Sequence, residues 1–93
     1  MIDLAEIQKE IVENKKRRGF NSSDVGKEII LLTEELGELA ASYRDQDDSE
    51  IKDAIGDMIV YLLGLCEITN TNSEELIRNI VEKNKTRNHR SGM

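Results

Sequence analysis

Apolar residues recur at steps of three and four along most of this chain, which is the spacing that places them on one side of an α-helix. The pattern predicts a first helix over about residues 2–18, followed by a glycine. A connection at residues 20–24 precedes a second helix, which Ser22 or Ser23 can cap and which should extend to about Tyr43. We expect one side of this second helix to be core; its residues are Ile29, Leu32, Leu36, Leu39, Ala40 and Tyr43.

A polar turn over residues 44–49 separates the second helix from a third, which Asp47 and Glu50 begin in a variant of the capping box. The third helix is predicted to reach Ile68, and its segment 58–66 is apolar on all sides apart from one glycine. A helix that is apolar all round is normally surrounded by other helices. We therefore expect this segment to be the central element of the fold.

A turn over residues 69–73 precedes a fourth helix, whose predicted buried stripe consists of Leu76, Ile77, Ile80 and Val81. Residues 88–93 are expected to fray. The connections are short, which favours antiparallel neighbours. The sequence thus predicts a single all-α domain over residues 1–93, with an antiparallel arrangement like that of a four-helix bundle.

The composition agrees with this fold and limits the possible functions. The chain has 93 residues, no proline and 3% aromatic residues, which argues against a β-sandwich or barrel. Because a chain this short can build only a small core, we expect it to associate into a homo-oligomer. The net charge of −6 disfavours a general nucleic-acid-binding surface.

The sequence gives no indication of a membrane or secretory role. Its apolar runs are much shorter than the roughly 20 residues that a membrane-spanning helix needs, and the N-terminal residues lack the apolar core of a signal peptide. The single cysteine, Cys66, cannot form an internal disulfide and lies in the apolar part of the third helix. We therefore expect a cytoplasmic protein.

Acidic residues gather at the edges of the predicted core. Glu35 and Glu38 are three residues apart, so both project from the same side of the second helix. Like charges held together at a core edge are destabilising unless a cation or a proton compensates. On the third helix, Glu50, Asp53 and Asp57 form a second acidic line at steps of three and four. Glu50 and Asp53 are explained equally well as acids near a helix start, where the helix dipole favours them.

Asp57 is the most informative of these acids because it directly precedes the apolar segment, where an unpaired carboxylate would be costly. Its expected neighbours are the acids of the second helix, so a cation between the two helices would satisfy both sets. Oxygen ligands select Mg²⁺ or Mn²⁺ over zinc, and the only histidine, His89, lies in the expected tail. Taken singly, Glu28, Glu34 and Glu67 are better explained as solvated acids on a helix face.

Basic residues form two clusters that flank the acids, one at residues 15–18 and one at residues 83–90. This layout would pair metal ligands with cations that bind phosphate, although a solvated helix end explains each cluster equally well. The aromatic residues able to stack on a base are Phe20, Tyr43 and Tyr61. Core packing is the better explanation for Tyr61, whereas Phe20, in its loop, fits a ligand contact as well as it fits packing.

The segments LTEELGELA at 32–40 and DAIGDMIVYL at 53–62 resemble the MazG-like all-α nucleoside triphosphate pyrophosphohydrolases, and the small phage-type members are the most similar. The resemblance extends from about Lys27 to Arg87. Its centre is the pattern E-E-x-x-E followed by E-x-x-D, and the first half is matched in full, at Glu34, Glu35 and Glu38. In the second half, Ala54 stands where a glutamate is usual, three residues before Asp57; Asp53 or Glu50 can fill that place.

The resemblance implies Mg²⁺-dependent hydrolysis of a nucleoside triphosphate, a deoxynucleotide in the first place, to the monophosphate and pyrophosphate. Its implied metal ligands are Glu35, Glu38 and Asp57, and Glu34 is implied as an outer ligand or as the group that positions the attacking water. Lys83 and Arg87 resemble the family's K-x-x-x-R pair, which binds the phosphates. Homodimers and homotetramers of helical bundles are common in this family.

Other functions stay open at this point. The chain could be a dUTP or dCTP diphosphatase or a phosphoribosyl-ATP pyrophosphohydrolase of the same superfamily. From a different class, it could be a catalytically silent helical interaction module, which the alanine at position 54 favours. A third hypothesis, a nucleic-acid adaptor that uses the basic ends, predicts strongly salt-dependent binding.

Overall fold

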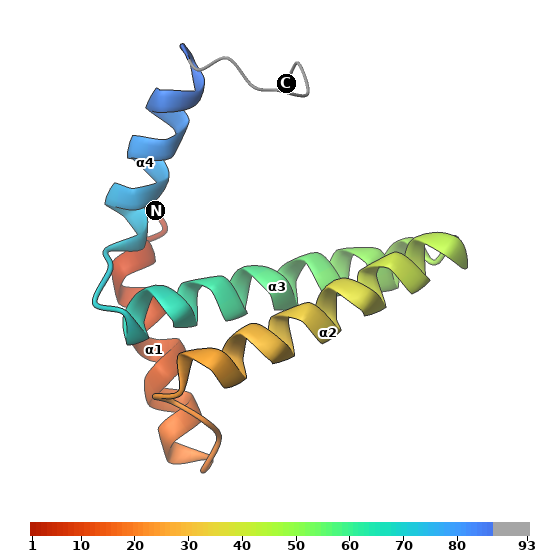
Figure 1. Ribbon diagram of the computed structural model, residues 1–93, viewed down its shortest axis with the longest axis horizontal. Coiled ribbons are helices and arrows are strands. Elements are labelled where there is room, and N and C mark those ends of the chain that lie inside the picture. Colours follow the sequence, from red (N-terminus) through yellow and green to blue (C-terminus); the bar gives the residue numbers. More distant parts are fainter. Residues whose placement is uncertain (87–93) are drawn as a thin grey trace.

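The computed structural model describes residues 1–86, and these residues form four α-helices joined by short connections (Figure 1). The prediction of an all-α fold is confirmed, and no strand occurs within these residues. The helices are α1 (Leu4–Arg17), α2 (Val25–Arg44), α3 (Asp48–Ile68) and α4 (Ser73–Asn84).

Each of the four helices begins at an Asp or Asn whose side chain accepts a hydrogen bond from a backbone N–H three residues later, at 3.1 Å. The predicted cap of α3, Asp47, is confirmed. The prediction for α2 is wrong, because Asp24 caps this helix in place of Ser22 or Ser23. The reason lies in Asn21, whose Oδ1 accepts a hydrogen bond from the Asp24 N–H at 3.1 Å and so fixes the turn.

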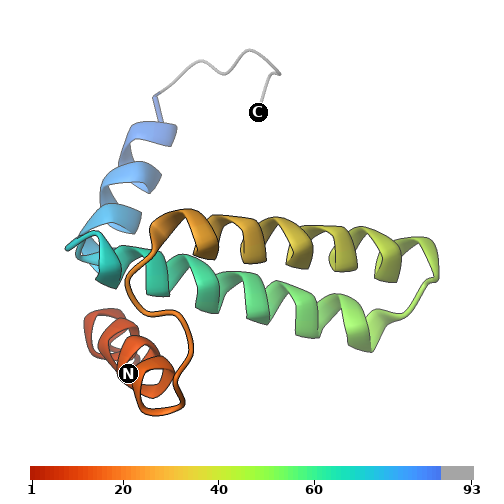
Figure 2. The same ribbon diagram turned by 60° about the horizontal axis from the view of Figure 1, so that its bottom comes forward.

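The helices α2 and α3 form an antiparallel hairpin, and the two views show them side by side along its whole length (Figures 1 and 2). The helix α1 packs across α3 at the end of the hairpin opposite the α2–α3 turn, and α4 leaves from that same end. Within the described part of the chain, the buried apolar side chains are Val12, Ala54 and Leu63. Val12 and Leu63 belong to α1 and α3, which pack together, whereas Ala54 lies in the half of α3 nearer the α2–α3 turn.

A buried glutamine joins α1 to the turn between α3 and α4. Gln8 is 5% exposed, and its Nε2 donates to Glu67 Oε1 at 2.9 Å and to the Thr71 carbonyl at 2.8 Å. Its Oε1 accepts from the Ser73 N–H at 3.0 Å. The prediction of Glu67 as a solvated acid is therefore wrong, because its carboxylate is half-buried and holds the side chain of Gln8.

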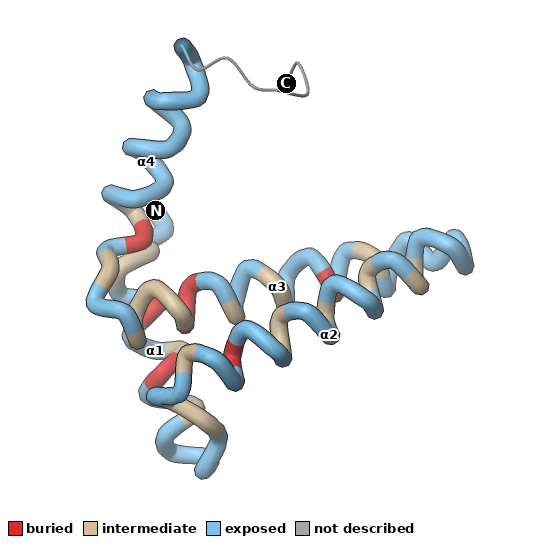
Figure 3. Tube along the Cα trace, viewed as in Figure 1, coloured by how far each residue is buried: buried red, intermediate tan, exposed pale blue. Residues whose placement is uncertain are grey.

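The four helices are arranged more openly than those of a compact four-helix bundle. The radius of gyration is 15.1 Å, whereas a compact chain of this length would have about 12 Å. The predicted buried stripe of α4 is exposed, at 42% for Leu76, 46% for Ile77, 39% for Ile80 and 53% for Val81. This prediction is wrong because α4 projects from the hairpin and contacts only α1 and α3 among the described helices (Figure 3).

Other predicted core positions are also at the surface. On α2, the exposed residues of the predicted stripe are Ile29, Leu36, Ala40 and Tyr43, and on α3 the exposed part of the apolar segment includes Ile59, Val60 and Leu62. The segment 58–66 is therefore not surrounded by helices of its own chain, because α1 covers only one end of the hairpin. Within residues 1–86, no helix combines the length and the hydropathy that crossing a lipid bilayer requires.

Candidate active site

A cavity of about 710 Å³ lies where the C-terminal end of α1 and the loop after it meet α2 and α3. The wall of this cavity carries carboxylates, cations and aromatic rings; they include Glu35, Asp57, Lys15, Arg18, Lys27, Phe20 and Tyr61. Its volume is within the range of small-molecule sites. The cavity thus brings acids from α2 and α3 together with cations from α1 and α2.

Glu35 is the acid on which the others converge. Its side chain is half-buried, and its Oε2 is fully shielded from solvent without a hydrogen-bond partner. Burial raises the pKa of Glu35 above its usual value, and the Glu38 carboxyl beside it and the charge of Asp57 raise this pKa further. An orphaned carboxylate oxygen with two other carboxylates nearby suits a hard divalent cation, which would bind oxygen and offset the repulsion.

Tyr61 of α3 lies beside the same acids. Burial raises its pKa, and the charges of Glu35, Asp57, Glu34 and Glu38 raise it further, in that order. The ring is half-buried and lies on the cavity wall. Tyr61 is therefore part of the candidate site, whereas the sequence favours a role in core packing.

The acids do not form a complete ligand set in this structure. Within residues 1–86, no three His, Cys, Asp or Glu side chains lie close enough together to hold a metal ion. Glu34, Glu38 and Asp57 are exposed, so the expectation that Asp57 is buried and needs a partner is wrong. Repulsion between like charges favours these exposed positions.

Two acids are candidates to replace the glutamate that is absent at position 54, and both are separate from the group around Glu35. Asp53 and Glu50 are exposed on α3, and neither lines the cavity. Neither is among the charges that raise the pKa of Glu35. Ala54 itself is buried, at 5% exposed. The structure therefore places Glu38 and Asp57 near enough to Glu35 to raise its pKa, although not near enough to form a ligand set, and it leaves Asp53 and Glu50 outside this group.

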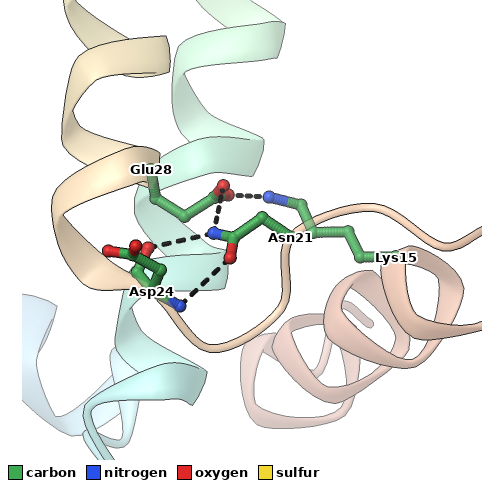
Figure 4. Close-up of polar contacts among 4 residues, drawn as sticks. All are labelled: Lys15, Asn21, Asp24 and Glu28. Carbon is green, nitrogen blue, oxygen red and sulfur yellow. Dashed lines mark hydrogen bonds and ion pairs between the residues drawn. The ribbon is translucent and has the colours of Figure 1, made fainter.

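A buried ion pair supports the cavity from the side of α1 (Figure 4). The Lys15 ammonium forms an ion pair with Glu28, whose side chain is only 1% exposed. The second oxygen of Glu28 accepts a hydrogen bond from Asn21 Nδ2 at 3.0 Å, and the same nitrogen donates to the Asp24 carbonyl at 2.9 Å. Glu28 is therefore not the solvated acid that the sequence predicts. It is the most buried charged residue of the described chain.

The Lys15 ammonium also lies over the ring of Tyr61, 4.9 Å from the ring centroid. Burial lowers the pKa of Lys15. The ion pair was not predicted from the sequence, but the spacing of two glutamates indicates that Glu28 faces the candidate site. Glu28 and Glu35 are seven residues apart, or two helical turns, and so lie on the same side of α2.

The two basic clusters have different positions. In the first, Lys15 and Arg18 lie on the cavity wall, whereas Lys16 and Arg17 are exposed and do not line it. In the second, Lys83 is exposed at the end of α4, on the side of the molecule away from the loop that follows α1 (Figures 1 and 2). Lys85 is also exposed, and it forms an ion pair with Glu82. The other basic residues of this cluster, Arg87, His89 and Arg90, lie outside the described residues.

The fold and the cavity together describe an all-α protein with carboxylates and cations around a space large enough for a nucleotide. A family model of the MazG nucleotide pyrophosphohydrolase domain matches residues 27–91, and the chain belongs to this family. Membership indicates a nucleotide pyrophosphohydrolase in a family that generally depends on divalent metal ions. No curated protein and no solved structure gives a significant match. Residues 1–26, which supply Lys15 and Phe20 to the cavity, lie outside the matched segment.

Proposed function

We propose that the protein hydrolyses nucleoside triphosphates, deoxynucleotides in the first place, to the monophosphate and pyrophosphate, and that it does so with Mg²⁺ or, in its place, Mn²⁺. This is an activity that clears unwanted nucleotides from the cellular pool. The observation that carries the proposal is the single cavity that Glu35 and Asp57 share with Lys15, Arg18 and Lys27. In the reaction, water adds across the anhydride between the α- and β-phosphates, and this phosphorus–oxygen bond breaks.

The carboxylates have the chemistry that such a reaction needs. Glu35, Glu38 and Asp57 would hold the metal, and Asp53 or Glu50 would add the ligand that Ala54 cannot supply. A bound divalent ion lowers the pKa of water and offsets charge on the phosphate oxygens. The support for this assignment is the orphaned Oε2 of Glu35 and its nearness to the other two acids.

The other charged residues have separate roles in this proposal. Glu34 is exposed one residue before Glu35, where it would orient the attacking water or accept its proton. The cations on the cavity wall would offset the charge that spreads over the phosphate oxygens in the transition state. Arginine can bind two phosphate oxygens at once, which suits Arg18 to this role.

We also propose that the protein acts as a homodimer or homotetramer. Support comes from the apolar faces that the chain leaves at the surface, and from an apolar groove of about 560 Å³ between α2, α3 and α4. Ile29, Leu62 and Ile77 line this groove, and each is close to half-exposed. Burying these side chains against a second copy would stabilise both. Light scattering over a range of protein concentrations tests the assembly.

The test of the proposed activity is turnover of a panel of nucleoside triphosphates with Mg²⁺, with Mn²⁺ and without metal. Pyrophosphate is detected by adding pyrophosphatase and measuring phosphate. We expect metal-dependent pyrophosphate release, loss of this release in Glu38→Gln, and retention of it in Glu10→Gln, an exposed acid of α1. The helical circular dichroism should be the same in all three proteins. Turnover in Glu38→Gln would remove Glu38 from the site.

Two further outcomes would change the assignment. The panel includes dUTP, dCTP and phosphoribosyl-ATP, so a strong preference for one of them would identify a different member of the superfamily. Absence of pyrophosphate from every substrate would favour a catalytically silent interaction module. That second candidate has support in the burial of Ala54 and in the incomplete ligand set within residues 1–86.

A further inference from the structure

Hydrogen bonds fix the backbone of the loop after α1 where it carries an aromatic residue. Gly19 has a φ of +74°, and its N–H donates to the Lys16 carbonyl at 3.1 Å. The N–H of Phe20 donates to the Lys15 carbonyl at 2.8 Å. These two bonds form a Schellman motif, which commonly ends a helix with glycine in the left-handed conformation. The backbone of Phe20 is thereby tied to the last turn of α1.

The side chain of Phe20 is exposed although it is large and apolar. Phe20 is 55% exposed and lies on the wall of the cavity that contains Glu35 and Asp57. The guanidinium carbon of Arg18 lies 4.8 Å from the centroid of the ring. A ring that is backed by a guanidinium and open to a cavity is a suitable surface for a flat, polarisable ligand.

The other two aromatic residues of the chain are less suited to this role. The ring of Tyr61 lies under the Lys15 ammonium and beside the acids. Tyr43 is 77% exposed in the last turn of α2, next to the α2–α3 turn, and it does not line the cavity. Phe20 is thus the aromatic residue of this cavity whose ring the Lys15 ammonium does not cover.

We propose that Phe20, backed by Arg18, is the surface on which the base of the nucleotide stacks. The loop between α1 and α2, which lies outside the segment matched by the family, would then supply base recognition. Because every base has an aromatic face, stacking alone tolerates different bases. The protein should therefore distinguish nucleotides from inorganic polyphosphates more strongly than it distinguishes one base from another. That the ligand is a nucleotide rests on the proposed function.

The chain contains no tryptophan, so Phe20→Trp introduces a single fluorophore at the proposed surface. Non-hydrolysable nucleoside triphosphate analogues, added with Mg²⁺, should quench its emission in a saturable way. Tripolyphosphate has no base, so any change in emission that it causes through Arg18 should be much smaller than that caused by the analogues, and equal quenching by both would overturn the inference. The matched control is Tyr43→Trp, another exposed aromatic position, whose emission should not respond. Absence of quenching of Phe20→Trp by every analogue would overturn the inference, whether or not the wild-type protein shows turnover.

Kinetics provide a second readout that a merely structural role would not change. Phe20→Ala should raise KM for purine and pyrimidine nucleotides by about tenfold with kcat largely retained, and Phe20→Tyr should restore KM. Because Phe20 is exposed, the helical circular dichroism of both variants should match that of the wild type. An unchanged KM in Phe20→Ala would overturn the stacking surface and leave the proposed function standing. Absence of turnover in the wild type would instead refute the proposed function, and the fluorescence titration would still decide the inference.

Discussion

Lys15 of α1 and Glu28 of α2 form an ion pair that is almost completely withdrawn from water, with side-chain exposures of 13% and 1%. The pair joins two helices whose backbones do not pack directly on each other, because α1 packs on α3 and α4. Through the ring of Tyr61, the Lys15 ammonium is also in contact with α3. The Lys15 side chain thus links α1 to both α2 and α3 at the wall of the cavity.

This ion pair predicts a strong effect on stability. Glu28→Gln leaves the Lys15 ammonium with little solvent and no counterion, so the free energy of unfolding should fall by about 3–5 kcal/mol. The double variant Lys15→Met with Glu28→Gln should recover much of this loss, because no unpaired charge remains. The measurement is urea unfolding followed by circular dichroism.

The control for this experiment is Glu82→Gln, which removes the exposed ion pair with Lys85. Its unfolding midpoint should stay close to that of the wild type, because exposed pairs contribute little. Equal losses in Glu28→Gln and in the double variant would contradict the explanation by an unpaired charge.

The buried Gln8 predicts a second effect on stability. Gln8→Leu removes three hydrogen bonds and leaves the Ser73 N–H without its acceptor, so the free energy of unfolding should fall by about 2 kcal/mol or more. The neighbouring Lys9 is exposed, and Lys9→Leu should change stability only slightly. Chemical denaturation of both variants tests the comparison. A Gln8→Leu protein as stable as the wild type would show that these hydrogen bonds add no net stability.

A third prediction concerns the ligand that Ala54 cannot supply. Asp53 lies one turn before Asp57, whereas Glu50 lies in the first turn of α3, where the helix dipole already favours an acid. Asp53→Asn should therefore raise the Mg²⁺ concentration for half-maximal activity by about tenfold or more, and Glu50→Gln should change it little.

The control for the metal titration is Asp48→Asn, which affects only an exposed ion pair with Lys52. Its Mg²⁺ dependence should match that of the wild type. A larger effect of Glu50→Gln would assign the position to Glu50. No effect of either variant would mean that Glu35, Glu38 and Asp57 suffice.

The fourth prediction concerns the pH dependence of a thiol. Burial raises the pKa of Cys66, so at a given pH a smaller fraction is thiolate, which is the reactive form. Alkylation by iodoacetamide at pH 8 should be slower than that of cysteine in a short peptide with blocked termini, and it should accelerate at a higher pH than in this free thiol. Intact-protein mass spectrometry gives the rates.

Unfolding in urea should abolish the difference between Cys66 and the free thiol. Cys66 also lines the apolar groove, so association through the groove should slow alkylation further as the protein concentration rises. A pH profile of the folded protein that coincides with that of the blocked cysteine peptide would contradict the effect of burial.

Local patterns in the sequence predicted most of the secondary structure. The Asp47 cap could be predicted because a capping box involves residues three apart in one segment. The Asp24 cap was missed because it depends on Asn21, which fixes the turn from outside the helix. Helical periodicity identifies a side that favours burial, but it does not show which helix covers that side. For this reason, Leu76 and Ile80 were assigned to a core that the chain by itself does not form.

The candidate site could be predicted only in part, for the same reason. Glu35, Glu38 and Asp57 could be proposed from the sequence because their spacing is local and their motif is recognisable. The contact between Lys15 and Glu28 spans 13 residues and depends on the position of α1 relative to α2. A sequence gives the side of a helix on which a residue lies, but it does not give the position of one helix relative to another.

The direction in which α4 leaves the hairpin has a consequence for the catalytic unit. It carries Lys83 away from the cavity of its own chain. In the proposed homo-oligomer, a phosphate held by this lysine would therefore have to lie in the cavity of a neighbouring subunit. Specific activity would then decline when dilution separates the subunits. Two inactive proteins, one altered at Glu35 and the other at Lys83, would regain activity when mixed, since a hybrid contains one site in which neither residue is altered.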